Sequence, residues 1–113
     1  MSSNVWLKCG KVYNLFPEPG VTSNTVGTKI YKDSPFATFQ ATVTGTGAVT
    51  ATVLIEGSND GVYWCSTPLA TITLSGTTSS SDGFTTQAPW KFIRANATSI
   101  SGTGANIQVY MGV

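Results

Sequence analysis

Apolar and polar residues alternate with a period of two over most of the chain after residue 36. The residues between the apolar ones are mainly Thr, Ser, Asn and Gln. Such alternation is typical of strands that bury one face and expose the other. The clearest apolar sets are Ala37, Phe39, Ala41, Val43; then Val49, Ala51, Val53, Ile55; then Ala70, Ile72, Leu74; and finally Ala105, Ile107, Val109, Met111, Val113. No window places apolar residues at helical spacing, so we expect an all-β fold.

Glycine-rich segments separate these runs. Gly45-Thr46-Gly47 predicts a tight turn that joins the first two runs into a hairpin. Asn59-Asp60-Gly61 predicts a second turn, and residues 76–83, which are almost wholly Ser, Thr and Gly, are expected to form an exposed, mobile loop. About eight short strands follow from this spacing, which favours an antiparallel β-sandwich or a jelly roll.

The first 34 residues lack this alternation, so we divide the chain into an N-terminal segment, 1–34, and a β-sandwich domain, 35–113. One interpretation of the N-terminal segment is a first strand and a loop packed on the domain. The other is an irregular arm that lies on a neighbouring subunit, because aromatic side chains often carry the binding energy of an interface. Its anchors would be Trp6, Tyr13, Leu15 and Phe16.

Size and charge narrow the classes of partner. The chain has 113 residues, 10% of them charged and 41% hydrophobic, with a net charge of +1. This suits one globular domain and supplies too little positive charge for the phosphate contacts of a nucleic-acid-binding protein. No apolar run is long enough to cross a membrane, and no signal peptide is evident, so we expect synthesis in a cytoplasm.

Residues that carry out chemistry are scarce. The chain has no His, which is the commonest general base and a common zinc ligand. Cys9 and Cys65 alone do not complete a zinc site; they are either reduced, as small hydrophobic side chains, or joined in a disulfide. We therefore expect no enzyme activity, no metal site and no cofactor.

Aromatic residues cluster in two later segments. Tyr63, Trp64, Trp90 and Phe92 have two interpretations: a platform on which sugar rings stack, or core packing with Trp90 at its rim. Arg94 follows in the second segment. Its aliphatic stem is suited to cover a neighbouring ring while the guanidinium pairs with Asp or a carbonyl.

The order of these motifs along the chain resembles that of a known class of proteins. The run Glu56-Gly57-Ser58-Asn59-Asp60-Gly61 is followed by Trp64 and later by the strand Ala88–Asn96 with its Trp, Phe and Arg. Residues 36–113 resemble small virion proteins of tailed bacteriophages. The resemblance implies a β-sandwich or jelly-roll decoration (cement) protein on the capsid exterior, bound to the shell of major capsid protein as a homodimer or homotrimer.

Two sets of contact residues follow for that role. The first is the arm, with Trp6, Tyr13, Leu15 and Phe16, and the second choice is Trp90 with Arg94. The alternative function is a carbohydrate-binding module, for a surface glycan, or a tail or baseplate part of a phage particle.

Overall fold

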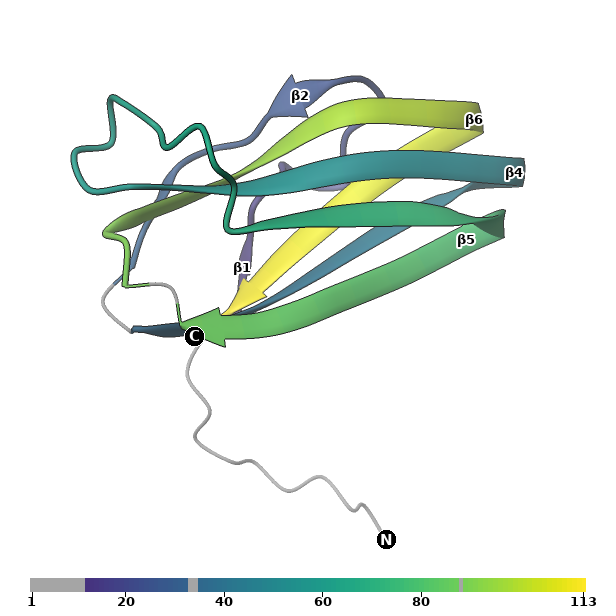
Figure 1. The fold of residues 1–113 in the computed structure, drawn as a ribbon. Helices are drawn as coiled ribbons and strands as arrows, with labels where there is room; N and C mark the ends of the chain where they lie inside the picture. The colour runs from purple at the N-terminus through teal and green to yellow at the C-terminus, as the bar shows by residue number, and fades with distance from the viewer. Residues whose placement is uncertain (1–11, 33–34, 88) are drawn as a thin grey trace, which may run out of the picture.

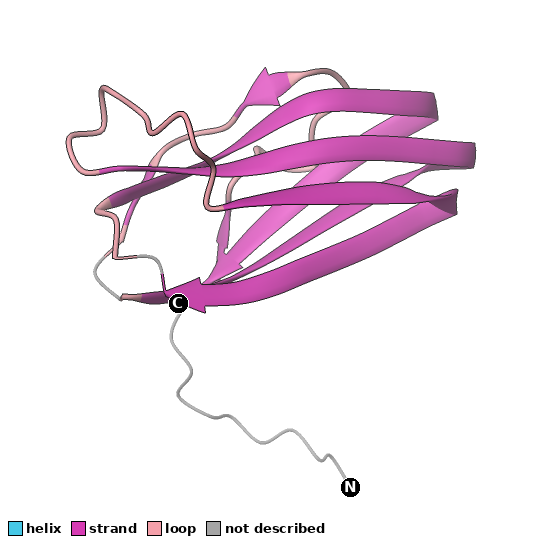
Figure 2. Ribbon diagram, viewed as in Figure 1, coloured by secondary structure: helices cyan, strands magenta, loops and turns pink. Residues whose placement is uncertain are grey.

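The computed structural model describes residues 12–32, 35–87 and 89–113, and in this part of the chain it is all-β and antiparallel, as predicted. Figure 2 shows strands and loops without a helix. The six strands form a single sheet. They are β1 (Val12–Asn14), β2 (Thr25–Val26), β3 (Ile30–Tyr31), β4 (Phe36–Ser58), β5 (Ala70–Gln87) and β6 (Phe92–Gly112).

Three long strands make up most of the sheet. Their order is β6-β4-β5, and the three short N-terminal strands all pair with β6 on the side away from β4. β1 pairs with residues 110–112 of β6, whereas β2 and β3 pair with residues 92–97. The last described strand of the chain therefore lies between its first strands and β4.

Each long strand bends near its middle, so the sheet folds back on itself into two layers (Figure 1). The bends coincide with register shifts of β4, which lie between Thr44 and Ala48 against β5 and between Thr44 and Thr50 against β6. Residues with positive φ lie at the bend in every long strand; they are Gly47, Thr78, Gly102 and Gly104. Glycine accepts positive φ readily, but at the β-branched Thr78, with φ of 65°, this backbone conformation is strained.

The core lies between the two layers. Alternate residues of β4 point inward on both sides of the bend, from Ala37 and Phe39 in one layer to Val53 and Ile55 in the other, and all belong to one buried cluster. At the edge, Phe84 of β5 stacks on Phe39 with 5.1 Å between ring centroids. Folding the sheet thus buries a shared apolar interior, which is the main driving force for the fold.

Two sequence predictions are corrected at the bends. The runs before and after Gly45-Thr46-Gly47 do not pair as a hairpin; both belong to β4 and pair with β5 and β6. Residues 76–83 are not a free loop but part of β5, where residues 79–87 pair with residues 36–44. The described residues form six strands and do not confirm a sandwich or jelly roll of eight, because the long strands continue through segments where turns were expected.

Residues 12–32 pack on the sheet, as in the first of the two interpretations of the N-terminal segment, and not as an arm that leaves it. Leu15 and Phe16 have exposed fractions of 0% and 3%, and Tyr13 packs against the same core. The Leu15 amide donates a hydrogen bond of 2.9 Å to the Val109 carbonyl, which continues the pairing that β1 begins. Two side chains that the arm hypothesis needs at the surface are therefore part of the core; Trp6 lies outside the described residues.

We expect Leu15→Ala to lower the free energy of unfolding by about 2–5 kcal/mol, because it removes a fully buried side chain. Val12→Ala, in the adjoining β1 but 69% exposed, is the matched control and should cost less than about 0.5 kcal/mol. Urea denaturation followed by tryptophan fluorescence measures both. Equal small losses would show that this segment is not part of the folded unit.

Candidate functional site

The loop between β4 and β5, residues 59–69, lies at the end of the molecule opposite the bends (Figure 1). Two hydrogen bonds attach its first part to neighbouring segments. The Lys29 ammonium donates to the Gly61 carbonyl at 3.1 Å, and the Lys91 amide donates to Asn59 Oδ1 at 3.3 Å. Gly61, with φ of +73°, packs so closely over Phe92 that a Cβ there would lie 3.3 Å from the ring. The loop is therefore held against β3 and the start of β6.

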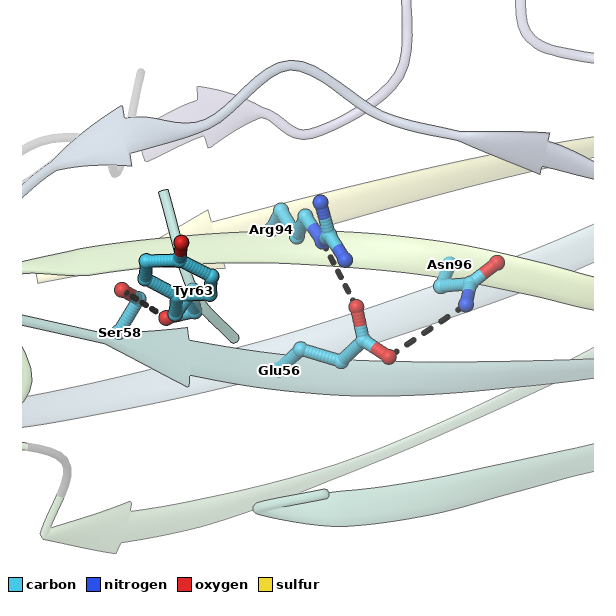
Figure 3. A network of polar contacts seen from close by, with 5 residues as sticks. All are labelled: Glu56, Ser58, Tyr63, Arg94 and Asn96. Atoms are coloured by element: carbon cyan, nitrogen blue, oxygen red, sulfur yellow. Dashed lines mark hydrogen bonds and ion pairs between the residues drawn. The ribbon is translucent and has the colours of Figure 1, made fainter. Parts of the chain in front are cut away.

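A polar turn shapes the tip of this loop. The Asp60 carboxylate accepts hydrogen bonds of 2.9 Å from the amides of both Val62 and Tyr63. The buried Ser58 hydroxyl lies 2.6 Å from the Tyr63 carbonyl oxygen (Figure 3). It accepts a hydrogen bond of 3.0 Å from the Gly61 amide. These bonds fix the backbone, while Val62 and Tyr63 as whole residues stay 68% and 82% exposed.

Hydrogen bonding also sets the protonation of Asp60. The Val62 amide, followed by the Tyr63 amide and the Ser58 hydroxyl, lowers the pKa of this carboxyl, since all three interactions favour the charged form. The turn is consequently built around a carboxylate. Asn59-Asp60-Gly61 is a turn, as the sequence predicted.

Aromatic rings and lysines lie together beside the loop. Tyr31 of β3 is 57% exposed and meets Phe92 of β6 edge to face, with 5.5 Å between centroids. Lys29 Nζ lies 5.5 Å from the centre of the Phe92 ring, and Lys91 Nζ lies 5.9 Å from that of Tyr31. We name Lys29, Tyr31, Lys91 and Phe92, with Val62 and Tyr63 at the loop tip, the aromatic–lysine patch.

The patch has a positive character. Within the described ranges, Lys29 and Lys91 face rings rather than carboxylates, since the ion pair found there joins Arg94 and Glu56. Lys32, a buried neighbour, has its pKa lowered by burial and, to a smaller extent, by the positive charge of Lys91. Exposed aromatic side chains with cations at their faces are suited to bind a protein surface that carries carboxylates.

A second cluster lies on the outer face of β4 and β6. Arg94 Nε is 2.7 Å from Glu56 Oε1, and Asn96 donates to the other oxygen of Glu56 at 3.4 Å (Figure 3). The Arg94 guanidinium lies 4.2 Å from the centre of the Trp64 ring, which is half-buried. The charge-assisted bond joins β4 to β6, and the contact of the guanidinium with Trp64 holds the loop to the sheet.

The two predicted sets of contact residues differ in exposure. Leu15 and Phe16 of the first set lie in the core, whereas Trp90 and Arg94 of the second set are half-buried. Trp90 is half-buried, and its ring packs on Gly57 so closely that a Cβ there would lie 2.7 Å from it. Arg94 pairs with Glu56, where the sequence suggested Asp or a carbonyl. Cys65 is half-buried without a disulfide partner among the described residues, and Cys9 lies outside them.

Sequence reasoning missed Lys29 and Tyr31 altogether. They lie in a polar, turn-rich stretch, and their proximity to Phe92 depends on the pairing of β3 with β6, in which Tyr31 faces Phe92. No local pattern signals this pairing. An exposed aromatic next to a strand-forming Ile was the one available hint.

Other features of the chain give no functional assignment. Among the described residues, no three His, Cys, Asp or Glu side chains gather closely enough to bind a metal ion. The same residues include no helix long and apolar enough to cross a membrane. Comparisons of the chain with models of protein families, with curated proteins and with solved structures found no match.

The lowered pKa of Asp60 predicts a pH dependence. Its hydrogen bonds stabilise the turn fully above the ordinary Asp pKa of about 3.9 and are lost as the pH falls through the lower folded-state value. The amide proton shifts of Val62 and Tyr63, measured by NMR, should therefore titrate below pH 4.

In Asp60→Ala this titration should disappear, whereas Asp82→Ala, which removes the exposed carboxylate of β5, should leave it unchanged. A transition at or above pH 4, or one that persists without Asp60, would contradict the assignment.

Proposed function

We propose that this chain is a structural virion protein that binds the assembled capsid of a tailed bacteriophage from outside, as a decoration protein, without enzymatic activity. The resemblance of residues 36–113 to small virion proteins supports the class. The folded all-β sheet is compatible with the β-sandwich scaffold which that class uses. The aromatic–lysine patch supports attachment to a protein surface.

The single observation that carries attachment is the exposure of the patch on a fixed backbone. Tyr31 and Tyr63 keep most of their side-chain surface accessible, yet their segments are held by strand pairing and by the Asp60 turn. A rigid loop loses little conformational entropy on binding, so the area buried by tyrosines contributes more fully to affinity. We therefore propose this patch, in place of the buried Leu15 and Phe16, as the contact with the shell.

The role agrees with the low charge of the chain. A protein that binds only the assembled shell stabilises it by mass action at many equivalent sites. Such binding needs few charges that must lose their water, and it needs no reaction centre. The two lysines of the patch would select a shell surface that bears carboxylates.

One observation favours the alternative of a carbohydrate-binding module. Trp64 lies beside Glu56 and Arg94, a combination of an aromatic ring with hydrogen-bonding groups that suits sugar recognition. However, the guanidinium already occupies one face of that ring. This cluster therefore ranks second.

Attachment is tested by co-sedimentation of the purified protein with empty shells of the encoding phage. Tyr31→Ala/Tyr63→Ala should raise the dissociation constant at least about tenfold, because tyrosines are enriched among the few interface residues whose truncation costs about 2 kcal/mol or more. Tyr110→Ala, which removes a half-buried tyrosine from the other layer, is the control and should bind as the unmodified chain does. Equal binding by all three would overturn the assignment of the patch.

The sugar alternative has its own measurement, retention of the free protein on a column of host surface polysaccharide. Under the decoration proposal the protein passes unretarded. Retention that is lost in Trp64→Ala, together with no binding to shells, would replace the proposed function by glycan binding. Copies per particle, counted by quantitative electrophoresis, separate a decoration protein, with hundreds, from a tail or baseplate part, with few.

A further inference from the structure

The two edges of the sheet differ. At one edge the short strands β1, β2 and β3 cover β6. At the other edge lies β5, which over its 18 residues pairs with β4 and with no other segment among those described. An edge strand of this length presents a long row of peptide groups without partners in the sheet, which is the usual template for pairing with another chain.

β5 has few of the features that normally prevent such pairing. Natural edge strands are often protected by Lys, by Pro or by their shortness. Ala70–Gln87 contains no Lys, Arg or Pro; its one charged residue, Asp82, lies on the inner face opposite Ala41 and is the single protective feature of this kind in the strand. The segment 77–81 is Thr and Ser only, so small side chains leave its backbone accessible.

The bend decides what kind of strand fits this edge. A strand that continues the sheet beyond β5 has to fold at the same level as β6, β4 and β5, which all have positive-φ residues there. A straight segment would pair with one layer only. β6 and β4 also have this bend, but each is paired on both sides among the described residues; the bent strand that lies at the open edge is β5 itself, with Thr78 at φ of 65°.

We propose that β5 is the site at which a second copy of this chain adds, with β5 antiparallel to β5 about a two-fold axis through the bend near Thr78. Rotation about this axis places each layer of one copy next to the opposite layer of the other copy. The inner face of every strand still faces the core, so the sheet continues as β6-β4-β5-β5-β4-β6. Such an isologous contact closes as a dimer and leaves this edge covered in both copies.

The register that follows pairs each residue before Thr78 with the residue equally far beyond it in the second copy. Inward-facing Ile72 then lies opposite Phe84, which is half-exposed at the edge and stacked on Phe39. On the outer face, Thr71 lies opposite Thr85. Asp82 faces Leu74, so the two Asp82 carboxylates do not oppose each other. Side-chain direction therefore matches along the whole strand, as pairing requires.

Charge placement on the outer face tests this register. In Thr71→Lys/Thr85→Lys, lysines would oppose each other twice across the axis, which should raise the dimer dissociation constant at least about tenfold. In Thr71→Lys/Thr85→Glu each lysine would face a glutamate, so the constant should return to within about threefold of the unmodified value. Sedimentation equilibrium over a range of concentrations measures these constants.

Thr38→Lys/Thr50→Lys is the matched control, because these exposed threonines lie in the same two layers but on β4, away from the edge. It should dimerise as the unmodified chain does. Thermal unfolding of every variant checks that the fold is kept. Hydrogen exchange should also show protection of peptides from residues 70–87 that rises with protein concentration.

Three results would overturn the proposal. The first is an unmodified chain that stays monomeric up to about 1 mM. The second is an equal loss of dimer in the β4 control. The third is a failure of the Lys/Glu pair to restore dimerisation. The experiment uses protein in solution, so its outcome is independent of attachment to a shell.

Discussion

The structure depends on one constraint: three long antiparallel strands must bend at the same level. A flat sheet of β6, β4 and β5 would expose the whole row of alternating apolar side chains on one face. Bending each strand near its middle turns that face onto itself, so Ala41 and Val43 share a core with Val49 and Ala51. Residues with positive φ, including the strained Thr78, make the bends possible.

The same fold positions the candidate site. Because the strands reverse at one end, the connection between β4 and β5 and the start of β6 lie together at the other end. β3 completes that end through its pairing with β6, which brings Tyr31 to Phe92. The Asp60 turn then holds Tyr63 outward. Contact surface and core thus occupy different parts of the molecule, so a partner can be bound without disturbing the packed interior.

The fold class was predictable from the sequence because alternation is a local property. Phe39, Val53 and Ile107 are buried where the period of two places them. The strand ends were not predictable, since glycines with positive φ serve equally in a hairpin turn and in a bend, and distant partners decide between them. Likewise, two prolines after Phe16 suggest a loose segment, whereas pairing of this region with β6, more than ninety residues away, puts Leu15 in the core. The patch depends on similar distant pairings.

The position of β6 has a consequence for synthesis on the ribosome. β6 is the last of the described strands to be translated, yet it separates β4 from β1, β2 and β3. Until it emerges, β4 and β5 are a two-stranded ribbon with an uncovered apolar face, which is not stable alone in water. Native pairing therefore waits until Phe92–Gly112 have been synthesised, and a message truncated before residue 92 would yield a product prone to aggregation rather than a smaller working domain.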